Sequence, residues 1–332
     1  MGTGFMKDPL ELSIIIVNWN SAEFVRRCVR SVREQTTGLD YEILVVDNAS
    51  FDGCEKMLKE HDPEVKYIQS DQNLGFARAN NLAFEASRGA SLLFLNPDTE
   101  IVGPAVVRLA RALRQLPGVG AVGARLLNGD GTTQTSCIQS FPTIMNQVLD
   151  SEYLRKKWPG SPLWGVAALY RAQSNPEEAE AISGACVMVR RDVFQRVGRF
   201  SEDYFMYTED IDLCYKLWRL GCKNYYVPDA TVIHFGGGSS LAAASNFSTV
   251  MTRESIWRFL RKTRGHVYGL GYRVSMLVSS FVRLAFLVTL FPAQPASRRR
   301  SSWNASFRKW QAILRWSMNR EEWLRQYRGP GL

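Results

Sequence analysis

The sequence lacks paired cysteines and a secretion signal. It has 6 cysteines, and no two of them form a C-x-x-C pair. A disulfide scaffold is therefore excluded, and we expect reduced, buried thiols in a cytosolic protein. The first 12 residues carry one lysine and no apolar stretch of signal-peptide length, so we also expect no secretion.

A glycine turn for a dinucleotide is also missing. The first apolar run, residues 12–17, is followed by Asn-Trp-Asn-Ser rather than by Gly-x-Gly-x-x-Gly. This disfavours a nicotinamide dehydrogenase, and the lack of a Gly- and Arg-rich loop disfavours a sugar-nucleotide pyrophosphorylase. Hydrophobic residues at 45% and charged residues at 22% exclude disordered and collagen-like chains.

Positive charge is concentrated in the last quarter of the chain. The net charge is +9, but residues 251–332 hold 16 basic and 3 acidic residues, and the first 250 hold 25 basic and 29 acidic. A length of 332 residues fits one large domain with an appendage. We therefore predict a main domain over residues 1–250 and a basic region over 251–332 that meets an anionic partner.

Apolar runs of strand length alternate with helical patterns along the main domain. The alternation predicts an α/β fold with right-handed crossovers and a mostly parallel sheet covered on both faces. Asn20 is expected to cap the first helix, and residues 126–180 are expected to form a loop-rich insertion before a second ordered block. The expected strands are 12–17, 42–46, 65–68, 91–95 and 119–122, and the expected helices are 24–32, 52–61, 76–87 and 104–116.

Polar residues follow the expected strands. Ligands of parallel sheets bind beyond the carboxyl ends of the strands, so these residues are candidates for a binding site. Asp98 offers a carboxylate to a magnesium or manganese ion, or merely forms a turn before the next helix. Asp47 can accept hydrogen bonds from a base or ribose, or can stabilise the turn that follows it.

An acidic cluster and a histidine stand in the second ordered block. Glu209, Asp210 and Asp212 lie at an expected helix start, where neighbouring like charges raise one another's pKa and suit a general base. Alternatively, Thr208 caps the helix and the acids complement its dipole. His234 precedes a glycine-rich stretch and is a candidate metal ligand beside a loop that closes over phosphates, or a structural histidine.

Six motifs in this order resemble those of family 2 glycosyltransferases, and most closely the bacterial rhamnosyltransferase-like branch. The resemblance covers about residues 12–240. The motifs are Ile-Ile-Val-Asn-Trp-Asn20, Val-Val-Asp-Asn-Ala-Ser-Phe-Asp-Gly53, Asn-Leu-Gly-Phe-Ala-Arg-Ala-Asn-Asn81, Leu-Asn-Pro-Asp98, Ser-Gly-Ala185 and Glu-Asp-Ile-Asp-Leu-Cys214.

The resemblance implies a GT-A fold and an inverting sugar transfer from a nucleotide sugar that depends on Mg²⁺ or Mn²⁺. By that likeness Asp98 and His234 hold the metal, and Asp210 is the catalytic base with Glu209 beside it. The family's Asp-x-Asp is Asn-Pro-Asp here, so only Asp98 contributes charge. The residues expected to bind the nucleotide sugar are Asn18, Asn20, Asp47, Asn73, Gly75, Arg78, Asn80 and Asn96.

The basic region holds two apolar features. Residues 274–291 form an 18-residue apolar run whose one charge, Arg283, makes spanning a bilayer costly and favours a segment in the interface or packed on the main domain. After Arg298-Arg299-Arg300, an aromatic helix face flanked by basic residues is typical of a helix on anionic lipid; a helix that covers the main domain is the alternative. No nucleic acid is expected. The face consists of Trp303, Phe307, Trp310, Ile313, Leu314 and Met318.

These features together lead to one functional expectation. We expect a glycosyltransferase that moves L-rhamnose from dTDP-rhamnose to a polyprenyl-diphosphate-linked or glycan acceptor in cell-surface glycan synthesis. It is expected at the cytoplasmic face of the bacterial inner membrane, as a peripheral or monotopic protein. A UDP-hexose transferase of the same fold and an inactive membrane-bound interaction subunit are the alternatives. Asp98, Asp210 and His234 together favour an enzyme.

Overall fold

The structure is a computed structural model that describes residues 10–151, 157–158, 161, 163, 175–236, 246–290 and 299–327. The chain forms two compact units. The first comprises Met1–Phe141, Leu169–Ser201 and Glu209–Ser239, and the second comprises Pro142–Ala168, Glu202–Thr208 and Ser240–Leu332. Part of the predicted loop-rich insertion, and residues 237–240 of the predicted glycine loop, lie outside the described residues.

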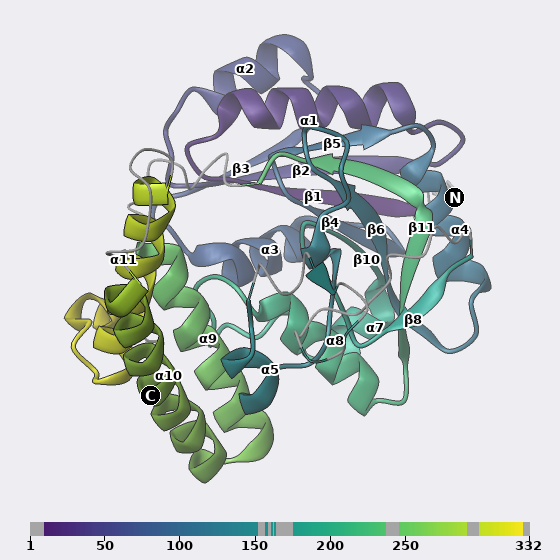
Figure 1. Ribbon diagram of the computed structural model, residues 1–332. Helices are drawn as coiled ribbons and strands as arrows, with labels where there is room; N and C mark the ends of the chain where they lie inside the picture. The colour runs from purple at the N-terminus through teal and green to yellow at the C-terminus, as the bar shows by residue number, and fades with distance from the viewer. Residues whose placement is uncertain are drawn as a thin grey trace, which may run out of the picture. The chain divides into compact units, whose positions relative to one another are not determined.

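A nine-stranded mixed sheet forms the centre of the first unit (Figure 1). Its strands are β1 (Leu12–Asn18), β2 (Tyr41–Asn48), β3 (Lys66–Ser70), β4 (Ser91–Leu95), β5 (Thr99–Val102), β6 (Val119–Leu127), β8 (Glu177–Ala179), β10 (Cys186–Arg190) and β11 (Lys223–His234). They lie in the order β3-β2-β1-β4-β10-β6-β11-β5, with β8 beside β11. The pairings of β1 with β2 and β4, and of β2 with β3, are parallel, as the strand–helix alternation predicts. Strand β10 runs antiparallel between β4 and β6.

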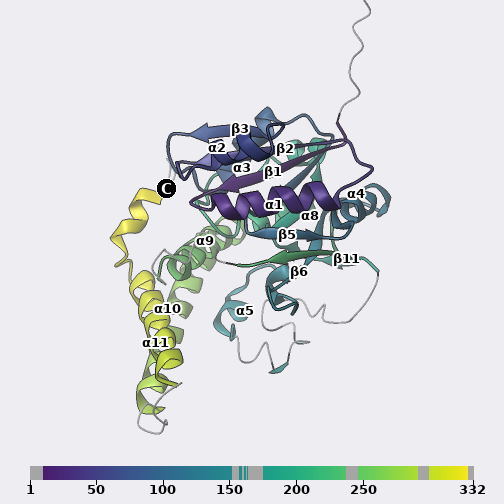
Figure 2. The same cartoon turned by 90° about the horizontal axis from the view of Figure 1, so that it is seen from above.

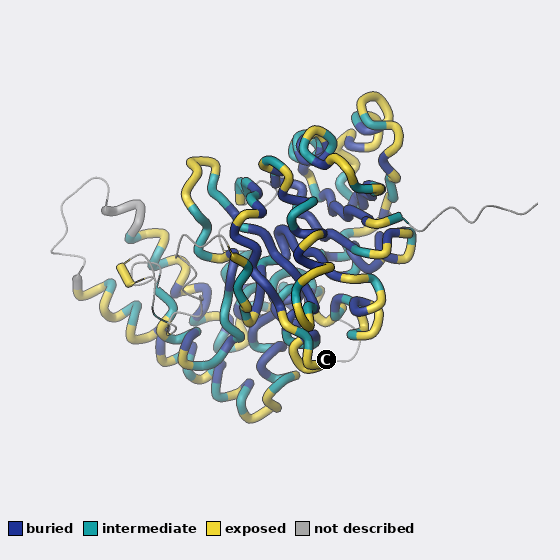
Figure 3. The backbone as a smooth tube through the Cα atoms, turned by 90° about the vertical axis from the view of Figure 1, so that its right-hand side faces the viewer, coloured by how far each residue is buried: buried dark blue, intermediate teal, exposed yellow. Residues whose placement is uncertain are grey.

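Helices cover both faces of this sheet. They are α1 (Ala22–Gln35), α2 (Cys54–His61), α3 (Gly75–Ala86), α4 (Ala105–Gln115), α7 (Arg191–Arg196) and α8 (Glu209–Arg219). Helices α1 and α2 lie on one face, and α3 and α8 lie on the other (Figure 1). The strands between these layers are buried along most of their length, which is why they consist of continuous apolar runs (Figure 3). All six cysteines are unpaired, and five of them are buried.

The predicted cap of α1 is wrong. Asn20 has a left-handed backbone conformation, with φ of 51°, and lies before the helix rather than at its cap. The amide of Ala22 donates instead to the carboxylate of Asp52 at 2.9 Å. A side chain from the loop after β2 therefore satisfies the first turn of α1, and a capping partner so distant in the chain cannot be recognised from local spacing.

The sequence pattern also missed strands β5 and β8, and it recognised β11 only as the short apolar run 230–233 before His234. Strand β5 has only 4 residues and follows Asp98 directly, so it resembles the turn that was an alternative for that segment. Strand β11 has 12 residues but contains Pro228 and shifts its register against β6 between Val227 and Thr231. Proline and an irregular register break the alternation from which a strand is recognised.

The second unit is helical. Its elements are α5 (Ile144–Val148), α9 (Asn246–Arg264), α10 (His266–Leu290), α11 (Arg299–Ser317) and the 3₁₀ helix η4 (Glu322–Tyr327). Helices α10 and α11 lie side by side (Figure 2), and both contact α9. A buried ion pair joins Arg258 to Glu254 on α9 at 3.3 Å, and the indole N–H of Trp316 on α11 donates to Glu254 at 2.9 Å. Arg258 also donates to the carbonyl of Asp203, which anchors residues 202–208 to α9.

The aromatic face predicted for α11, for which lipid contact and cover of the main domain were the two alternatives, packs in part on helices of its own unit. Trp310 and Ile313 are buried, and the ring of Trp310 receives the guanidinium of Arg283 on α10 at 4.3 Å from its centroid. The indole N–H of Trp303 donates to the carbonyl of Leu287, also on α10. The face packs on neighbouring helices of its own unit, because an aromatic stripe serves equally for lipid and for a partner helix.

Candidate active site

The carboxyl ends of four strands meet at one edge of the sheet. Asn18 at the end of β1 is in register with Asp47 on β2, which is in register with Gln69 on β3. Strand β4 pairs with the other side of β1, and Asn96 directly follows its last residue. This edge is the position at which open α/β sheets bind their ligands, and it gathers the polar residues that the sequence pattern singled out.

Asp47 is fully buried and holds the turn after β2. Its Oδ1 accepts a hydrogen bond from the amide of Ser50 at 2.7 Å, and its Oδ2 accepts one from the hydroxyl of Tyr67 at 2.9 Å. Burial, with the carboxylate beside it, raises the pKa of the Tyr67 hydroxyl, so this group remains a proton donor to Asp47. The carboxylate can accept about four hydrogen bonds and therefore retains capacity for a ligand.

Asn18 and Asn20 shape the loop after β1. The side-chain amide of Asn18 donates to Asp52 at 3.1 Å, and its carbonyl accepts from the Ser21 hydroxyl at 2.8 Å. The backbone amide of Asn20 donates to the hydroxyl of Ser50 at 2.8 Å, and Asn20 is exposed. Asn18 thus joins the loops after β1 and β2, whereas Asn20 stands at the surface of the edge.

Asn73 and Gly75 form the entrance to α3. The side-chain oxygen of Asn73 accepts hydrogen bonds from the side-chain amide of Asn48 at 2.9 Å and from the backbone amide of Gly75 at 3.0 Å. Gly75 has φ of 76°, a conformation that glycine adopts at little cost. Their hydrogen bonds give both residues a structural role in the loop that joins β3 to α3.

The remaining predicted residues of this motif lie on α3. Asn80 is buried, and its amide donates to the carbonyl of Phe76, one turn earlier, at 2.9 Å. Arg78 is partly exposed. Of these two side chains, only that of Arg78 is open to solvent.

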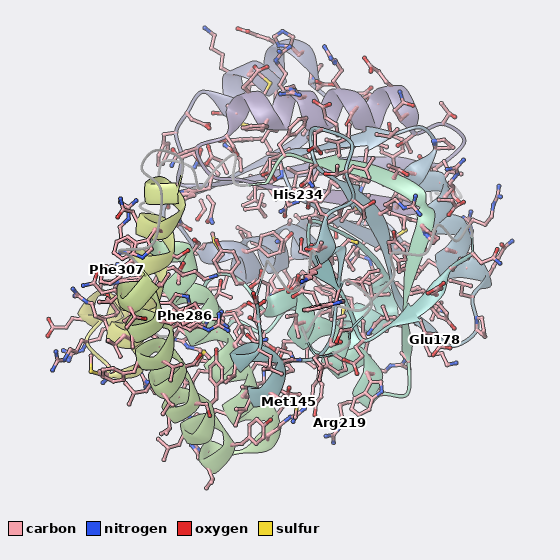
Figure 4. All side chains as sticks on the ribbon, in the orientation of Figure 1. Met145, Glu178, Arg219, His234, Phe286 and Phe307 are labelled. Atoms are coloured by element: carbon pink, nitrogen blue, oxygen red, sulfur yellow. The ribbon has the colours of Figure 1, made fainter. Side chains whose placement is uncertain are left out.

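Asp98 and His234 are brought together by the pairing of β5 with β11. His234 is in register with Thr99, and the amide of Phe235 donates to the carbonyl of Asp98 at 2.9 Å. The Nε2 atom of His234 (Figure 4) lies 3.3 Å from Oδ1 of Asp98 and 3.3 Å from the side-chain nitrogen of Asn96. Residues 136 positions apart in the sequence thus meet beside the end of β4.

Gln134 contacts both the backbone and the ring of His234, and its role was not identified from the sequence. Its amide nitrogen donates to the carbonyl of His234 at 2.6 Å, so its oxygen faces Nδ1 of the ring at 2.9 Å. An amide oxygen can only accept a hydrogen bond, so a neutral ring carries its hydrogen on Nδ1 and its lone pair on Nε2. The lone pair therefore lies beside the carboxylate of Asp98.

This arrangement fits a divalent cation. Two ligand atoms bound at about 2.1 Å and roughly at right angles lie about 3 Å apart, which is close to the separation of Nε2 and Oδ1. Among the described residues no group of three His, Cys, Asp or Glu side chains could hold a metal. The described part of the chain thus offers two candidate ligand atoms, and water and the phosphates of a substrate would complete the coordination of a bound cation.

Asp210, at the start of α8, is joined to the end of β4 through one turn. Its Oδ2 accepts a hydrogen bond from the amide of Gly184 at 2.8 Å, and the carbonyl of Ala185 accepts one from the amide of Asn96 at 2.9 Å. A Cβ atom at position 184 would stand 3.1 Å from that of Asp210. A side chain at this position would require Asp210 to shift by a few tenths of an ångström, which gives the glycine of the Ser-Gly-Ala motif a physical reason.

The three acids of α8 have different surroundings. Asp212 is buried and accepts a hydrogen bond from the Ser201 hydroxyl, with the ammonium of Lys216 at 3.4 Å. Glu209 is buried with no hydrogen-bond partner for Oε2, and burial together with the charge of Asp210 raises its pKa well above the usual value. Burial also raises the pKa of Asp210, although hydrogen bonds from Gly184 and Ile211 oppose this. Both pKa values are therefore raised, and Asp210 is the more exposed of the two carboxyl groups.

The chain is similar in sequence to known proteins. The model of the family described as "Glycosyl transferase family 2" matches residues 13–198, and that of "Glycosyl transferase family group 2" matches residues 141–319. An N-acetylglucosaminyl-diphospho-decaprenol L-rhamnosyltransferase of Mycobacterium tuberculosis is 28% identical over 67% of this chain and 75% of its own length. Rhamnosyltransferase WbbL of Escherichia coli is 25% identical over 67% of this chain and 82% of its own. A hexosyltransferase, Agl10, of Haloferax volcanii is 29% identical over 63% and 62%.

Solved structures share the fold. Mannosyltransferase PcManGT of Pyrobaculum calidifontis, in complex with GDP-Man and Mn²⁺, superposes with a TM-score of 0.59 at 15% identity, over 95% of this chain and 88% of that one. GalNAc-T7 with UDP, GalNAc and Mn²⁺ gives a TM-score of 0.55 at 18% identity, over 76% and 48%. The predicted α/β GT-A fold is confirmed. The chain belongs to glycosyltransferase family 2 and is a glycosyltransferase.

Proposed function

We propose that this enzyme transfers L-rhamnose from dTDP-rhamnose to a polyprenyl-diphosphate-linked acceptor in bacterial cell-surface glycan synthesis, with inversion at the anomeric carbon. The relatives' names support the donor and the acceptor, since two of them are rhamnosyltransferases and one of these acts on a diphospho-decaprenol sugar. The Haloferax volcanii relative is a hexosyltransferase, which supports transfer of a hexose, for instance from a UDP-hexose, as the second candidate.

One observation carries the proposed chemistry. Asn96 and Asp210 bind the same turn, Asn96 through the carbonyl of Ala185 and Asp210 through the amide of Gly184. His234 and Asp98 adjoin Asn96. The two candidate ligands of a cation and the candidate base are therefore built around one short segment of backbone, as a reaction at a diphosphate requires.

Asp210 is the proposed catalytic base. It takes the proton from an acceptor hydroxyl while that oxygen forms a bond to the anomeric carbon. The bond from this carbon to the diphosphate breaks on the opposite side of the sugar, and the configuration inverts. Glu209 stays protonated and leaves the negative charge to Asp210, and the amide of Gly184 orients the carboxylate.

Asp98 and His234 are the proposed holders of Mg²⁺ or Mn²⁺. Their oxygen and nitrogen atoms, 3.3 Å apart, suit one ion, and Gln134 fixes the ring with its lone pair toward Asp98. A bound ion would neutralise the negative charge that develops on the leaving diphosphate. Asn96 lies against the same ring and is proposed to position it.

Asp47 is the proposed contact for the nucleotide. Its carboxylate retains acceptor capacity, and it lies at the edge with the exposed Asn20 and the partly exposed Arg78. Asn18, Asn73, Gly75 and Asn80 are engaged in local hydrogen bonds. We propose that these four shape the surrounding loops rather than contact the donor.

The proposed location is the cytoplasmic face of the inner membrane. A polyprenyl-linked acceptor resides in the bilayer, and residues 251–332 carry 16 basic against 3 acidic residues, which favours an anionic lipid surface.

A donor panel tests the proposed function. The purified full chain is incubated with a polyprenyl-diphosphate N-acetylglucosamine and with dTDP-rhamnose, UDP-glucose, UDP-N-acetylglucosamine or GDP-mannose, each with Mn²⁺ or with EDTA. We expect mass spectrometry to detect rhamnosyl transfer that EDTA abolishes, and NMR to give a product linkage opposite to the donor's configuration. Transfer from a UDP-hexose alone would assign the second candidate, and a retained configuration would contradict the single displacement.

Gln134→Leu is expected to weaken divalent-ion binding about 10- to 100-fold, the usual cost of losing the partner that orients a histidine ligand. The variant removes both hydrogen bonds to His234. Titration of Mn²⁺ into the enzyme with dTDP present measures the affinity by calorimetry. Gln139→Leu is the control, since the Gln139 amide donates to the carbonyl of Ser136, away from His234. An unchanged affinity in Gln134→Leu would remove Gln134 from this role.

A further inference from the structure

One face of α10 is a continuous exposed apolar stripe. Most of its members follow one another at three or four residues, so they lie on one side of the helix. Each has an exposed fraction between 51% and 86%, and Phe286 is labelled in Figure 4. The stripe consists of Val267, Leu270, Val274, Val278, Phe281, Val282, Phe286 and Val288. A patch of this size exceeds the single apolar side chains that are normal on a protein surface.

The charges of α10 point away from this stripe. Arg273 donates to the carbonyl of Trp316 at 3.0 Å, and Arg283 donates to the carbonyl of Val148 at 2.8 Å. Tyr272 and Met276 are fully buried on the same side as these arginines. One side of the helix is therefore packed on its own unit, and the other side is apolar and carries no charge.

The packing of one side of α10 on its own unit disfavours a helix that spans the membrane. The segment His266–Thr289 is long and apolar enough to cross a bilayer by length and composition, with a mean hydropathy of 1.4. Its inner side, however, is packed on α9 and α11. These two helices expose charged residues such as Lys262, Arg308 and Lys309, and a bundle that contains them is too polar to cross. A helix that offers lipid only one side lies in the plane of the interface.

The basic residues on either side of the stripe favour the bilayer, rather than a second copy of the chain, as the partner that covers it. Arg261, Lys262 and Arg264 end α9 just before the stripe, and Arg298, Arg299 and Arg300 follow it in the sequence. Two copies meeting through α10 would bring two strongly basic regions together. Anionic lipid headgroups would instead neutralise them, at about 1 kcal/mol for each basic residue near the surface.

We infer that α10 is the membrane-docking surface of the enzyme, lying in the plane of an anionic leaflet with the stripe among the acyl chains. The inference deepens the proposed function, since it names the surface that meets the membrane of the lipid-linked acceptor. It assigns the lipid contact to α10 rather than to the aromatic face of α11, in which Trp310 and Ile313 are buried. The stripe from Val267 to Val288 is about 32 Å long at 1.5 Å per residue, so it covers several lipids.

Vesicle flotation with the full chain tests the inference. Vesicles of phosphatidylcholine with 30% phosphatidylglycerol are expected to bind the wild type. The variant Val274→Glu/Val282→Glu is expected to bind at least tenfold more weakly, because it places two carboxylates among the acyl chains. The control Val102→Glu/Leu220→Glu changes two exposed apolar residues of the first unit by the same charge and is expected to bind as the wild type does. Circular dichroism spectra of both variants verify that they are folded.

Three results would overturn the inference. The first is undiminished vesicle binding by the folded Val274→Glu/Val282→Glu variant. The second is a wild-type dimer in light scattering that this variant dissociates, which makes the stripe a subunit interface. The third is a protein that alkaline carbonate cannot extract from membranes, as expected of a spanning helix. None of these measurements uses sugar transfer, so they remain decisive if the donor panel contradicts the proposed function.

Discussion

Asp210→Asn is expected to lower kcat about 10²- to 10⁴-fold, the range that loss of a general acid–base catalyst produces. An amide cannot accept the proton of the acceptor hydroxyl. Its oxygen can still accept the hydrogen bond that the Gly184 amide gives to the carboxylate, so the local fold remains. Calorimetric affinity for the donor is therefore expected to stay within a factor of about three, because the loss falls on the transition state.

Asp212→Asn is the matched control, two residues further along the same helix. Asp212 is buried between Ser201 and Lys216, so its loss is expected to lower the melting temperature and to leave kcat of the folded enzyme nearly unchanged. Near-normal turnover of Asp210→Asn would remove Asp210 from the role of base. Equal losses of kcat in both variants would show that the helix start tolerates neither change, and would assign both effects to structure.

The pH dependence of Asp210 follows from the direction of its pKa shift. Burial raises this pKa above the ordinary value of about 4, and a base acts only when unprotonated, so kcat is expected to fall as the pH falls through the raised value. A raised carboxyl pKa favours the folded state below the unfolded-state pKa, and this contribution is lost as the pH rises through the folded-state pKa. At neutral pH Asp210→Asn is therefore expected to melt no lower than the wild type.

Glu254→Leu is expected to destabilise the helical unit by about 3–5 kcal/mol, the usual cost of removing one partner of a buried ion pair. The side chains of Glu254 and Arg258 are 2% and 6% exposed, so Arg258 would keep a buried charge without its carboxylate. Trp316 would also lose its hydrogen-bond acceptor. Because two units need not unfold together, hydrogen exchange of the amides of α9 and α11 is the measurement of choice.

Two further variants separate the ion pair from its surroundings. Glu254→Leu/Arg258→Met replaces both charges and is expected to recover most of the loss, since apolar replacement of a complete buried pair is often neutral. Asp203→Asn removes an exposed partner of Lys262 and is expected to cost less than about 1 kcal/mol. A double variant as unstable as Glu254→Leu would show that hydrogen bonds, rather than the unpaired charge, dominate the energy.

The sheet and its functional edge could be predicted because long buried strands leave a strong local signal. The apolar runs before Asp47 and Asp98 mark β2 and β4 directly, and parallel topology then brings their carboxyl ends together. Glu209, Asp210 and Asp212 were visible as a cluster in the sequence. Their different surroundings depend on burial and on contacts from Gly184, Ser201 and Lys216, which the sequence does not display.

Gln134 and Tyr67 could not be predicted for a different reason. Gln134 lies in a stretch without periodicity and contacts His234 across 100 positions of the chain. Tyr67 lies within an expected strand, where an aromatic residue is ordinary, and its hydrogen bond to Asp47 depends on the register of β2 and β3. Partners that only orient a functional side chain leave no motif of their own in a single sequence.

The C-terminal helices show that composition alone does not predict which face of a helix is exposed. Trp310 and Ile313 of α11 and Val278 of α10 are all apolar residues on helix faces in one basic region, yet the first two are buried and the third is exposed. Which face a helix turns to its neighbours depends on packing among α9, α10 and α11. The sequence offered both residues 274–291 and the aromatic face of α11 as lipid contacts, and only the packing shows which of these faces is exposed.

Glu209 is buried and Asp210 is partly exposed, and this difference bears on the proposed catalytic cycle. As the proposed base, Asp210 would hold the proton of the acceptor hydroxyl after transfer and would have to return it to solvent before the next turnover. Glu209 is buried beside it, so this exchange would run through Asp210 itself. Proton release would then be a step separate from sugar transfer, and a bulky acceptor that stays over Asp210 after the reaction would delay it.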